Sequence, residues 1–196
     1  MQKIRVVFLD RDGVINKYPG DRQYVKSYAE FHFLPEVKSA LKKLISSGFR
    51  LFVVSNQAGV SKGIYPQENL DDITDKMLND LAGDGINISA VYYCTHRPED
   101  NCDCRKPKIG LLEKAAVKLR QENLEIDFKE SYFVGDSIRD IETGKSAHLK
   151  TILVFSGKEK PENKDNWQTV PDFSARDLSE AAELIIAHSK NPGTRL

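Results

Sequence analysis

Short apolar runs alternate with longer amphipathic segments through most of this 196-residue sequence. The apolar runs are rich in Val, Ile and Phe, and the segments between them carry apolar residues at helical spacing. Regular alternation of strand and helix favours a parallel sheet covered by helices. We therefore predict an α/β fold, a three-layer sandwich with a mostly parallel central sheet. Strands are expected at 5–9, 50–54, 88–93, 131–134 and 150–155, and helices at 35–47, after Pro66, at 111–122, after Ser137 and at 178–188.

The length of the chain suits one domain, because a domain of about this size buries most of the surface that its unfolded chain exposes. We expect a single domain over residues 1–190 and a frayed tail at 191–196. The polar, aromatic stretch 16–33 is expected to form a flap over the end of the first strand. Tyr24 in this flap is a candidate substrate contact.

The charges balance, with 29 Lys and Arg against 29 Asp and Glu. No global positive field is therefore expected to attract nucleic acid or an anionic membrane. No segment approaches the roughly 18 apolar residues of a membrane span, and the N-terminus enters the first strand without a signal-like apolar run. We expect a soluble, cytoplasmic, monomeric protein whose partner is a small molecule.

Two carboxylates, Asp10 and Asp12, directly follow the first predicted strand, and Gly13 allows the chain to turn there. They could be ordinary turn residues, since Asp is common in turns. Alternatively they bind Mg²⁺, which prefers oxygen ligands, and one of them acts as a nucleophile.

Other polar groups follow later strands and are expected at the same edge of the sheet. Ser55 and Asn56 could donate to a phosphate group or simply form a turn. Asp136 follows Gly135 after a later strand, so three acids converge and a bound Mg²⁺ would relieve their repulsion. Asp140 could orient ligands or cap the next helix, and the cap is slightly favoured.

All three cysteines lie in one short segment. Cys94, His96, Cys102 and Cys104 form a pattern of three thiols and an imidazole over residues 94–104, which predicts a closed, structural Zn²⁺ site. The alternative is free thiols beside a lone surface histidine. The zinc loop would present the two cations that follow it.

Those two cations are Arg105 and Lys106. Lys106 could neutralise phosphoryl charge, and Arg105 could bind a second anionic or hydroxyl-bearing part of a substrate. The alternative is a solvated basic pair.

With these residues assembled, the sequence resembles the haloacid-dehalogenase superfamily of phosphotransferases. Asp10 and Asp12 match its first motif, Ser55 its second, Lys106 its third and Asp136 its fourth. The resemblance covers nearly the whole chain. It implies a Rossmann-like sheet, and the spacing of the motifs leaves no room for a large cap domain.

Within that superfamily, the stretches 8–16, 102–107 and 134–137 resemble the branch that dephosphorylates D-glycero-D-manno-heptose 1,7-bisphosphate at C7, in nucleotide-heptose and lipopolysaccharide biosynthesis. The histidinol-phosphate branch shares the zinc loop and is the nearest alternative. Residues 31–35 and 140–145 favour the heptose branch. The short zinc loop and Gln23, where Gly is common, depart from its usual pattern.

The resemblance also implies the role of each residue. Asp10 attacks the phosphoryl group, and Asp12 protonates the leaving oxygen and then activates water. Mg²⁺ is held by Asp10, Asp136 and the backbone carbonyl of Asp12. Ser55 and Lys106 neutralise the phosphoryl oxygens. The expected substrate contacts are Asn56, Arg105 and Tyr24.

Two further functions remain open at this point. A nucleic-acid 3′-end phosphatase could share the first motif, although the balanced charge disfavours it. A non-catalytic, zinc-stabilised binding module would account for the zinc pattern alone. Such a module would not need Asp10, Asp12 and Asp136.

Overall fold

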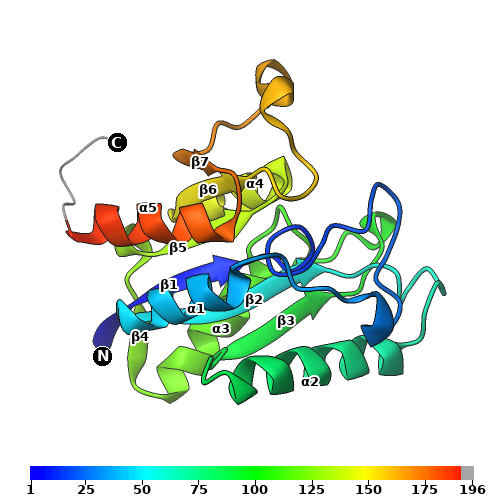
Figure 1. Ribbon diagram of the computed structural model, residues 1–196, viewed down its shortest axis with the longest axis horizontal. Helices are drawn as coiled ribbons and strands as arrows, with labels where there is room; N and C mark the ends of the chain where they lie inside the picture. The colour runs from blue at the N-terminus through cyan, green and yellow to red at the C-terminus, as the bar shows by residue number, and fades with distance from the viewer. Residues whose placement is uncertain (191–196) are drawn as a thin grey trace.

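The computed structural model describes residues 1–190, which form a seven-stranded sheet with layers of helices on both faces (Figure 1). The strand order is β3-β2-β1-β5-β6-β7, with β4 pairing the start of β1, and all these pairings are parallel. The predicted α/β fold class is therefore confirmed. The predicted tail lies outside the described residues. The strands are β1 (Gln2–Leu9), β2 (Phe49–Asn56), β3 (Ala90–Cys94), β4 (Leu124–Ile126), β5 (Tyr132–Gly135), β6 (Lys150–Val154) and β7 (Phe173–Ala175).

Two hydrophobic clusters join the helices to the sheet, one on each face. Apolar residues of α1 (Val37–Ser46), α2 (Gln67–Gly83) and α5 (Leu178–Lys190) belong to one cluster. The other cluster contains residues of α3 (Gly110–Gln121) and the segment after α4 (Ile138–Ser146). The predicted three-layer arrangement is thus observed, with a core on each side of the sheet.

Strand β1 lies at the centre of the sheet, between β2 and β5. Its residues Val6 to Leu9 are fully buried. Val7 and Leu9 belong to one cluster and Val6 and Phe8 to the other, as expected for a strand whose successive side chains point to opposite faces. Burial on both faces explains its unbroken apolar sequence, and the strand ends where Asp10 begins.

Several short elements were not predicted. Strands β4 and β7 have three residues each, too few for an alternating pattern to stand out. Strand β2 is longer than expected, and β3 starts at Ala90 instead of residue 88 and ends one residue later. Ser55, Asn56 and Cys94 therefore lie within strand ends instead of following them. Short 3₁₀ helices occur at Tyr28–Glu30, Pro98–Asp100, Phe128–Glu130 and Pro161–Asn166.

An isolated backbone bridge between Asn16 and Phe33 joins the two ends of the stretch 16–33, and a second bridge joins Asn16 to Asp12. Val25 and Phe31 are buried and join the core. Within residues 1–190 no inserted cap domain interrupts the sheet. None of the helices in this range is long and apolar enough to cross a membrane.

Candidate active site

The carboxyl ends of β1, β2 and β5 border a cavity of about 210 Å³. Flap residues 18–20 and 22–24, and the two cations that follow the zinc loop, also line it. Every site residue predicted from the sequence, apart from the four proposed zinc ligands, lines this cavity: Asp10, Asp12, Tyr24, Ser55, Asn56, Arg105, Lys106 and Asp136. The roles of these residues stay predictions.

Lys106 is buried between two carboxylates. Its Nζ lies 2.9 Å from Asp10 Oδ2 and 2.5 Å from Asp140 Oδ1, and it donates to the Val54 carbonyl at 3.1 Å. Although burial opposes its charge, Asp10 and Asp140 raise the pKa of Lys106. The ammonium group therefore stays charged where it borders the cavity beside Asp10.

Asp140 caps α4, which is the role that the sequence slightly favoured. Its Oδ2 accepts from the backbone N–H of Ser137 at 3.0 Å and from the Ser137 hydroxyl at 2.6 Å, which caps α4. Its other oxygen faces Lys106. The residue that caps α4 therefore also positions Lys106.

The acids fit a hard cation. Ligand oxygens of Asp10, Asp136 and Asp140 lie within 4.8 Å of one another. Burial, and then the charges of Asp10 and Asp140, raise the pKa of Asp136 well above its usual range. Of these three acids, Asp10 and Asp136 line the cavity and Asp140 does not, so we expect Asp10 and Asp136 to hold Mg²⁺.

A close approach of backbone keeps Asp136 in place. A Cβ on Gly13 would lie 2.2 Å from Asp136 Oδ2, and one on Gly157 would lie 2.0 Å from the same oxygen. The backbone N–H of Lys158 donates to this oxygen at 2.8 Å. Gly13 also has φ of 81°, so both space and conformation require glycine there.

Magnesium should stabilise the protein more at high pH than at low pH. Burial raises the pKa of Asp10 to about 6 from 3.8, with Lys106 opposing and Asp140 adding to the shift. The folded state thus binds this proton more tightly than the unfolded chain. The resulting stability, about 3 kcal/mol, is present below pH ~4 and lost as pH rises through ~6 in the metal-free protein.

Mg²⁺ should compensate for the stability that is lost when Asp10 deprotonates, because the ion binds deprotonated carboxylates. Thermal unfolding with and without Mg²⁺ should therefore show a larger rise in Tm at about pH 8 than at about pH 5. NaCl at matched ionic strength is the control. An equal rise at both pH values would contradict a cation site at Asp10.

Asp12 is held by side chains that the sequence interpretation did not single out. Its carboxylate accepts hydrogen bonds from Arg11, Asn16 and Gln57. Arg11 lies between the two motif aspartates and Gln57 follows the Ser55-Asn56 pair, so their positions in the motifs were the only available signal.

The other cavity residues have defined partners. The Asn56 amide pairs with the backbone of Lys106, donating to its carbonyl at 3.2 Å and accepting from its N–H at 3.1 Å. Asn56 therefore joins the end of β2 to the segment that carries Lys106. Arg105 donates to the His96 carbonyl at 3.2 Å, and the Tyr24 hydroxyl accepts from Lys62 at 3.0 Å.

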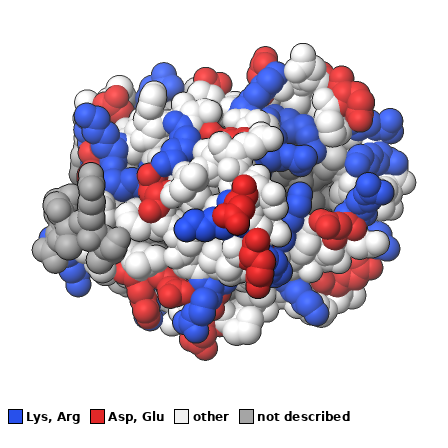
Figure 2. All heavy atoms as spheres, turned by 90° about the horizontal axis from the view of Figure 1, so that it is seen from above, with Lys and Arg blue, Asp and Glu red and all other residues white. Residues whose placement is uncertain are grey.

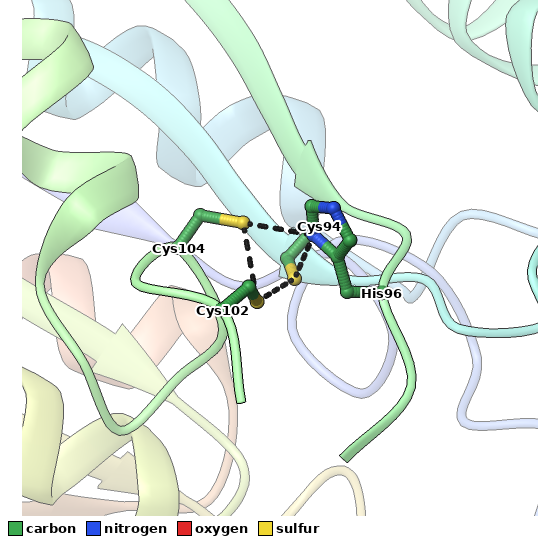
Figure 3. A group of neighbouring side chains, drawn as sticks. All are labelled: Cys94, His96, Cys102 and Cys104. Carbon is green, nitrogen blue, oxygen red and sulfur yellow. Dashed lines mark hydrogen bonds between the residues drawn. The ribbon is translucent and has the colours of Figure 1, made fainter. Parts of the chain in front are cut away.

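The four proposed zinc ligands point toward one another (Figure 3). The Sγ of Cys102 lies 3.6 Å from those of both Cys94 and Cys104, and His96 Nδ1 lies 3.6 and 3.3 Å from Cys94 and Cys104. A tetrahedral Zn²⁺ with bonds of about 2.3 Å separates its sulfurs by about 3.8 Å. The donor set and spacing therefore fit zinc.

Removing zinc should destabilise the protein. Burial raises the pKa of Cys94 to about 12, and a bound cation would displace that proton. Cys94→Ser should lose one zinc per chain by atomic absorption, and its Tm should fall by several degrees, as expected for a loss of more than about 1 kcal/mol. His148→Ala, which lies outside the cluster, is the control. Full zinc content in Cys94→Ser would contradict the assignment.

Comparisons with known proteins agree with this geometry. The family model described as polynucleotide kinase 3 phosphatase matches residues 5–187. A D-glycero-D-manno-heptose-1,7-bisphosphate 7-phosphatase of Chlorobaculum tepidum is 36% identical over 188 residues, covering 92% of this chain and 94% of that protein. A relative from Campylobacter jejuni, named for the alpha substrate, is 33% identical and covers 81% of this chain and 86% of its own. One from Escherichia coli K12, named for the beta substrate, is 34% identical with coverages of 85% and 88%.

A solved structure is also similar over nearly its whole length. It is the D,D-heptose 1,7-bisphosphate phosphatase from B. bronchiseptica complexed with magnesium and phosphate, with 29% identity and a TM-score of 0.82. The match covers 94% of this chain and 99% of that one. The chain therefore belongs to the haloacid-dehalogenase-type phosphatases, in the family of the D-glycero-D-manno-heptose-1,7-bisphosphate 7-phosphatases.

Proposed function

We propose that the protein is a cytoplasmic, Mg²⁺-dependent phosphatase that removes the C7 phosphate of D-glycero-D-manno-heptose 1,7-bisphosphate, a step of nucleotide-heptose biosynthesis. The observation that carries the proposal is the meeting of Asp10, Asp12, Ser55, Lys106 and Asp136 around one cavity, in a chain 36% identical to a phosphatase named for this substrate. Residues 1–190 would act as one catalytic domain and the chain as a monomer.

Asp10 is the proposed nucleophile. Its Oδ1 accepts from the Arg11 backbone N–H at 2.6 Å, and its Oδ2 faces Lys106 at 2.9 Å. The carboxylate is therefore fixed in orientation before substrate arrives. Its attack forms an aspartyl-phosphate as the bond from phosphorus to O7 of the sugar breaks.

Asp12 is the proposed acid and base. It gives a proton to O7 as the sugar leaves, then takes a proton from the water that attacks the aspartyl-phosphate. That second displacement releases phosphate and restores Asp10.

The remaining groups are proposed to neutralise and position the phosphoryl group. When bound at Asp10, Asp136 and the Asp12 carbonyl, Mg²⁺ would neutralise charge on the phosphoryl oxygens. Ser55 and Lys106 would donate to the same oxygens, and electrostatic positioning supplies most of the rate in phosphoryl transfer.

Specificity is proposed to come from Asn56, Arg105 and Tyr24, on three different segments around the cavity. Arg105 would meet the part of the sugar that lies away from the reacting phosphate. The flap and the zinc loop would shield the reaction from water.

The name of the matching family model favours one second candidate, a phosphatase of nucleic-acid 3′ ends. On the face seen in Figure 2, Lys and Arg side chains are interspersed with Asp and Glu. The formal net charge is zero. Neither feature supplies the continuous basic track that binds a nucleic-acid backbone.

Steady-state kinetics on a panel of phosphate esters test the proposal. The panel contains both anomers of the heptose bisphosphate, histidinol phosphate, fructose bisphosphate and a 3′-phosphorylated oligonucleotide. The highest kcat/KM should belong to one heptose anomer, and the preferred anomer is assigned by the same data. A higher value for histidinol phosphate or for the oligonucleotide would move the protein to that activity. If no ester showed Mg²⁺-dependent turnover, the non-catalytic, zinc-stabilised binding module would be the remaining hypothesis.

A further inference from the structure

Arg11 is fully buried beside the cavity, with its guanidinium on the carboxylate of Asp12. Nη2 lies 3.1 Å from each Asp12 oxygen, and Nε lies 3.4 Å from Oδ1. The group also lies over the Tyr93 ring, 5.6 Å from its centre. Among residues 1–190, Nη1 has no hydrogen-bond partner.

This placement is costly for stability alone. A buried guanidinium loses its hydration and gains only when it is paired well, whereas an apolar side chain of similar volume could fill the same space. Asp12 is the one carboxylate paired with Arg11 within residues 1–190, and Asp12 faces the cavity. The charge of Arg11 is therefore directed at the residue proposed to carry the proton.

Gln57, the residue that follows β2, approaches the same carboxylate. Its Nε2 donates to Asp12 Oδ2 at 2.8 Å and lies 3.2 Å from Ser55 Oγ. Its Oε1 accepts from the Tyr65 hydroxyl at 3.0 Å. The Asp12 carboxylate accepts from the NH₂ group, and the hydroxyl of Tyr65 stabilises this orientation by donating to Oε1.

Tyr65 is held firmly in that role. It is buried, and a Cβ on Gly59 would lie 2.3 Å from its ring. Burial also raises the pKa of Tyr65 to about 12, so the hydroxyl keeps its proton near neutral pH. A chain of contacts thus runs from Tyr65 through Gln57 to Asp12.

We propose that Arg11 and Gln57, with Tyr65 fixing the Gln57 amide, are positioning residues that hold the Asp12 carboxylate for proton transfer. The inference rests on the proposed function. Asn16 completes the set by donating to Asp12 Oδ1 at 2.8 Å. Donors on both oxygens fix the plane of the carboxylate, and misplacing a reacting group by about 1 Å can cost roughly 10²-fold in rate.

The proposal separates the two chemical steps. Attack by Asp10 on 4-nitrophenyl phosphate needs no proton from Asp12, because 4-nitrophenolate leaves as an anion. Attack on the heptose ester needs one, because a sugar alkoxide is a poor leaving group. Hydrolysis of the aspartyl-phosphate needs Asp12 as base with either substrate.

Rapid-mixing kinetics on Arg11→Met, Gln57→Leu and Tyr65→Phe test the proposal. With 4-nitrophenyl phosphate, Arg11→Met and Gln57→Leu should release a burst of 4-nitrophenolate close to one per enzyme, then turn over slowly. On the heptose bisphosphate, their kcat should fall by about 10²-fold while KM changes less than about threefold. Tyr65→Phe should also lower kcat on the heptose bisphosphate with little change in KM, but by a smaller factor.

Two variants away from the cavity are matched controls. Arg5 is a half-buried arginine over the Phe49 ring, and Tyr132 is a buried tyrosine bonded to His188. Arg5→Met and Tyr132→Phe should lower Tm and should leave kcat on both substrates, and the size of the 4-nitrophenolate burst, as in wild type. Arg11→Lys keeps the buried charge but loses the planar set of guanidinium donors. Its kcat on the heptose bisphosphate should lie between those of Arg11→Met and wild type.

These measurements distinguish failure of the proposed function from failure of the inference about Arg11 and Gln57. If the wild-type protein hydrolyses no phosphate ester, the proposed function fails. If wild type is active and Arg11→Met, Gln57→Leu and Arg11→Lys keep the wild-type heptose kcat or raise KM instead, the inference fails. Equal losses on both substrates with no burst would also overturn it, because that pattern marks general damage.

Discussion

Asp10→Asn should abolish phosphate release from the heptose bisphosphate, with a loss on the order of 10⁴-fold or more, because an amide cannot serve as the nucleophile. The fold should survive. Asn has nearly the same shape, and removing one charge relieves repulsion in the group formed by Asp10, Asp136 and Asp140. The measurements are phosphate release and thermal unfolding, with the exposed Asp165→Asn as the control.

Residual activity near wild type in Asp10→Asn would contradict the account, because it would mean that water attacks phosphorus directly. Acid quenching of the wild-type reaction gives an independent check. A phosphoenzyme should be trapped in wild type and in Asp165→Asn, and should be absent from Asp10→Asn.

Lys106→Met should damage both stability and activity. The change leaves Asp10 and Asp140 buried without their shared cation, and breaking a buried ion pair by removing one partner costs about 3–5 kcal/mol. Activity should fall by roughly 10²-fold or more, because a charge on the phosphoryl group is no longer neutralised. Urea unfolding and steady-state kinetics measure the two effects.

The double variant Lys106→Met with Asp140→Asn separates these effects. Removing the stranded charge of Asp140 should recover part of the stability, since the amide still accepts from Ser137. Activity should not return. Recovery of activity in the double variant would show that Lys106 serves the fold and not the phosphoryl group.

The periodic parts of the fold were predictable from the sequence. Strand β1 is buried on both faces, which forces an unbroken apolar run, and the stripe of α2 follows from its contact with the sheet. Strands β4 and β7 have three residues each, and pairing with a longer neighbour stabilises them instead of a pattern of their own.

The candidate site was predictable only in part, for a similar reason. A residue such as Asp136 stands out because a carboxylate at a strand end is costly without a cation. Arg11 and Gln57 did not stand out, because arginine and glutamine are ordinary surface residues. Their burial against Asp12 depends on the meeting of β1 with β2 and of both with Tyr65, which is tertiary information.

Phosphorus NMR of the heptose 1,7-bisphosphate during turnover tests the central claim most directly. The account predicts that the signal of the C7 phosphomonoester disappears as inorganic phosphate appears, while the C1 glycosyl phosphate persists. The reaction should require Mg²⁺ and should be absent with Asp10→Asn. Loss of the C1 signal, or an unchanged spectrum with the wild-type protein and Mg²⁺, would contradict it.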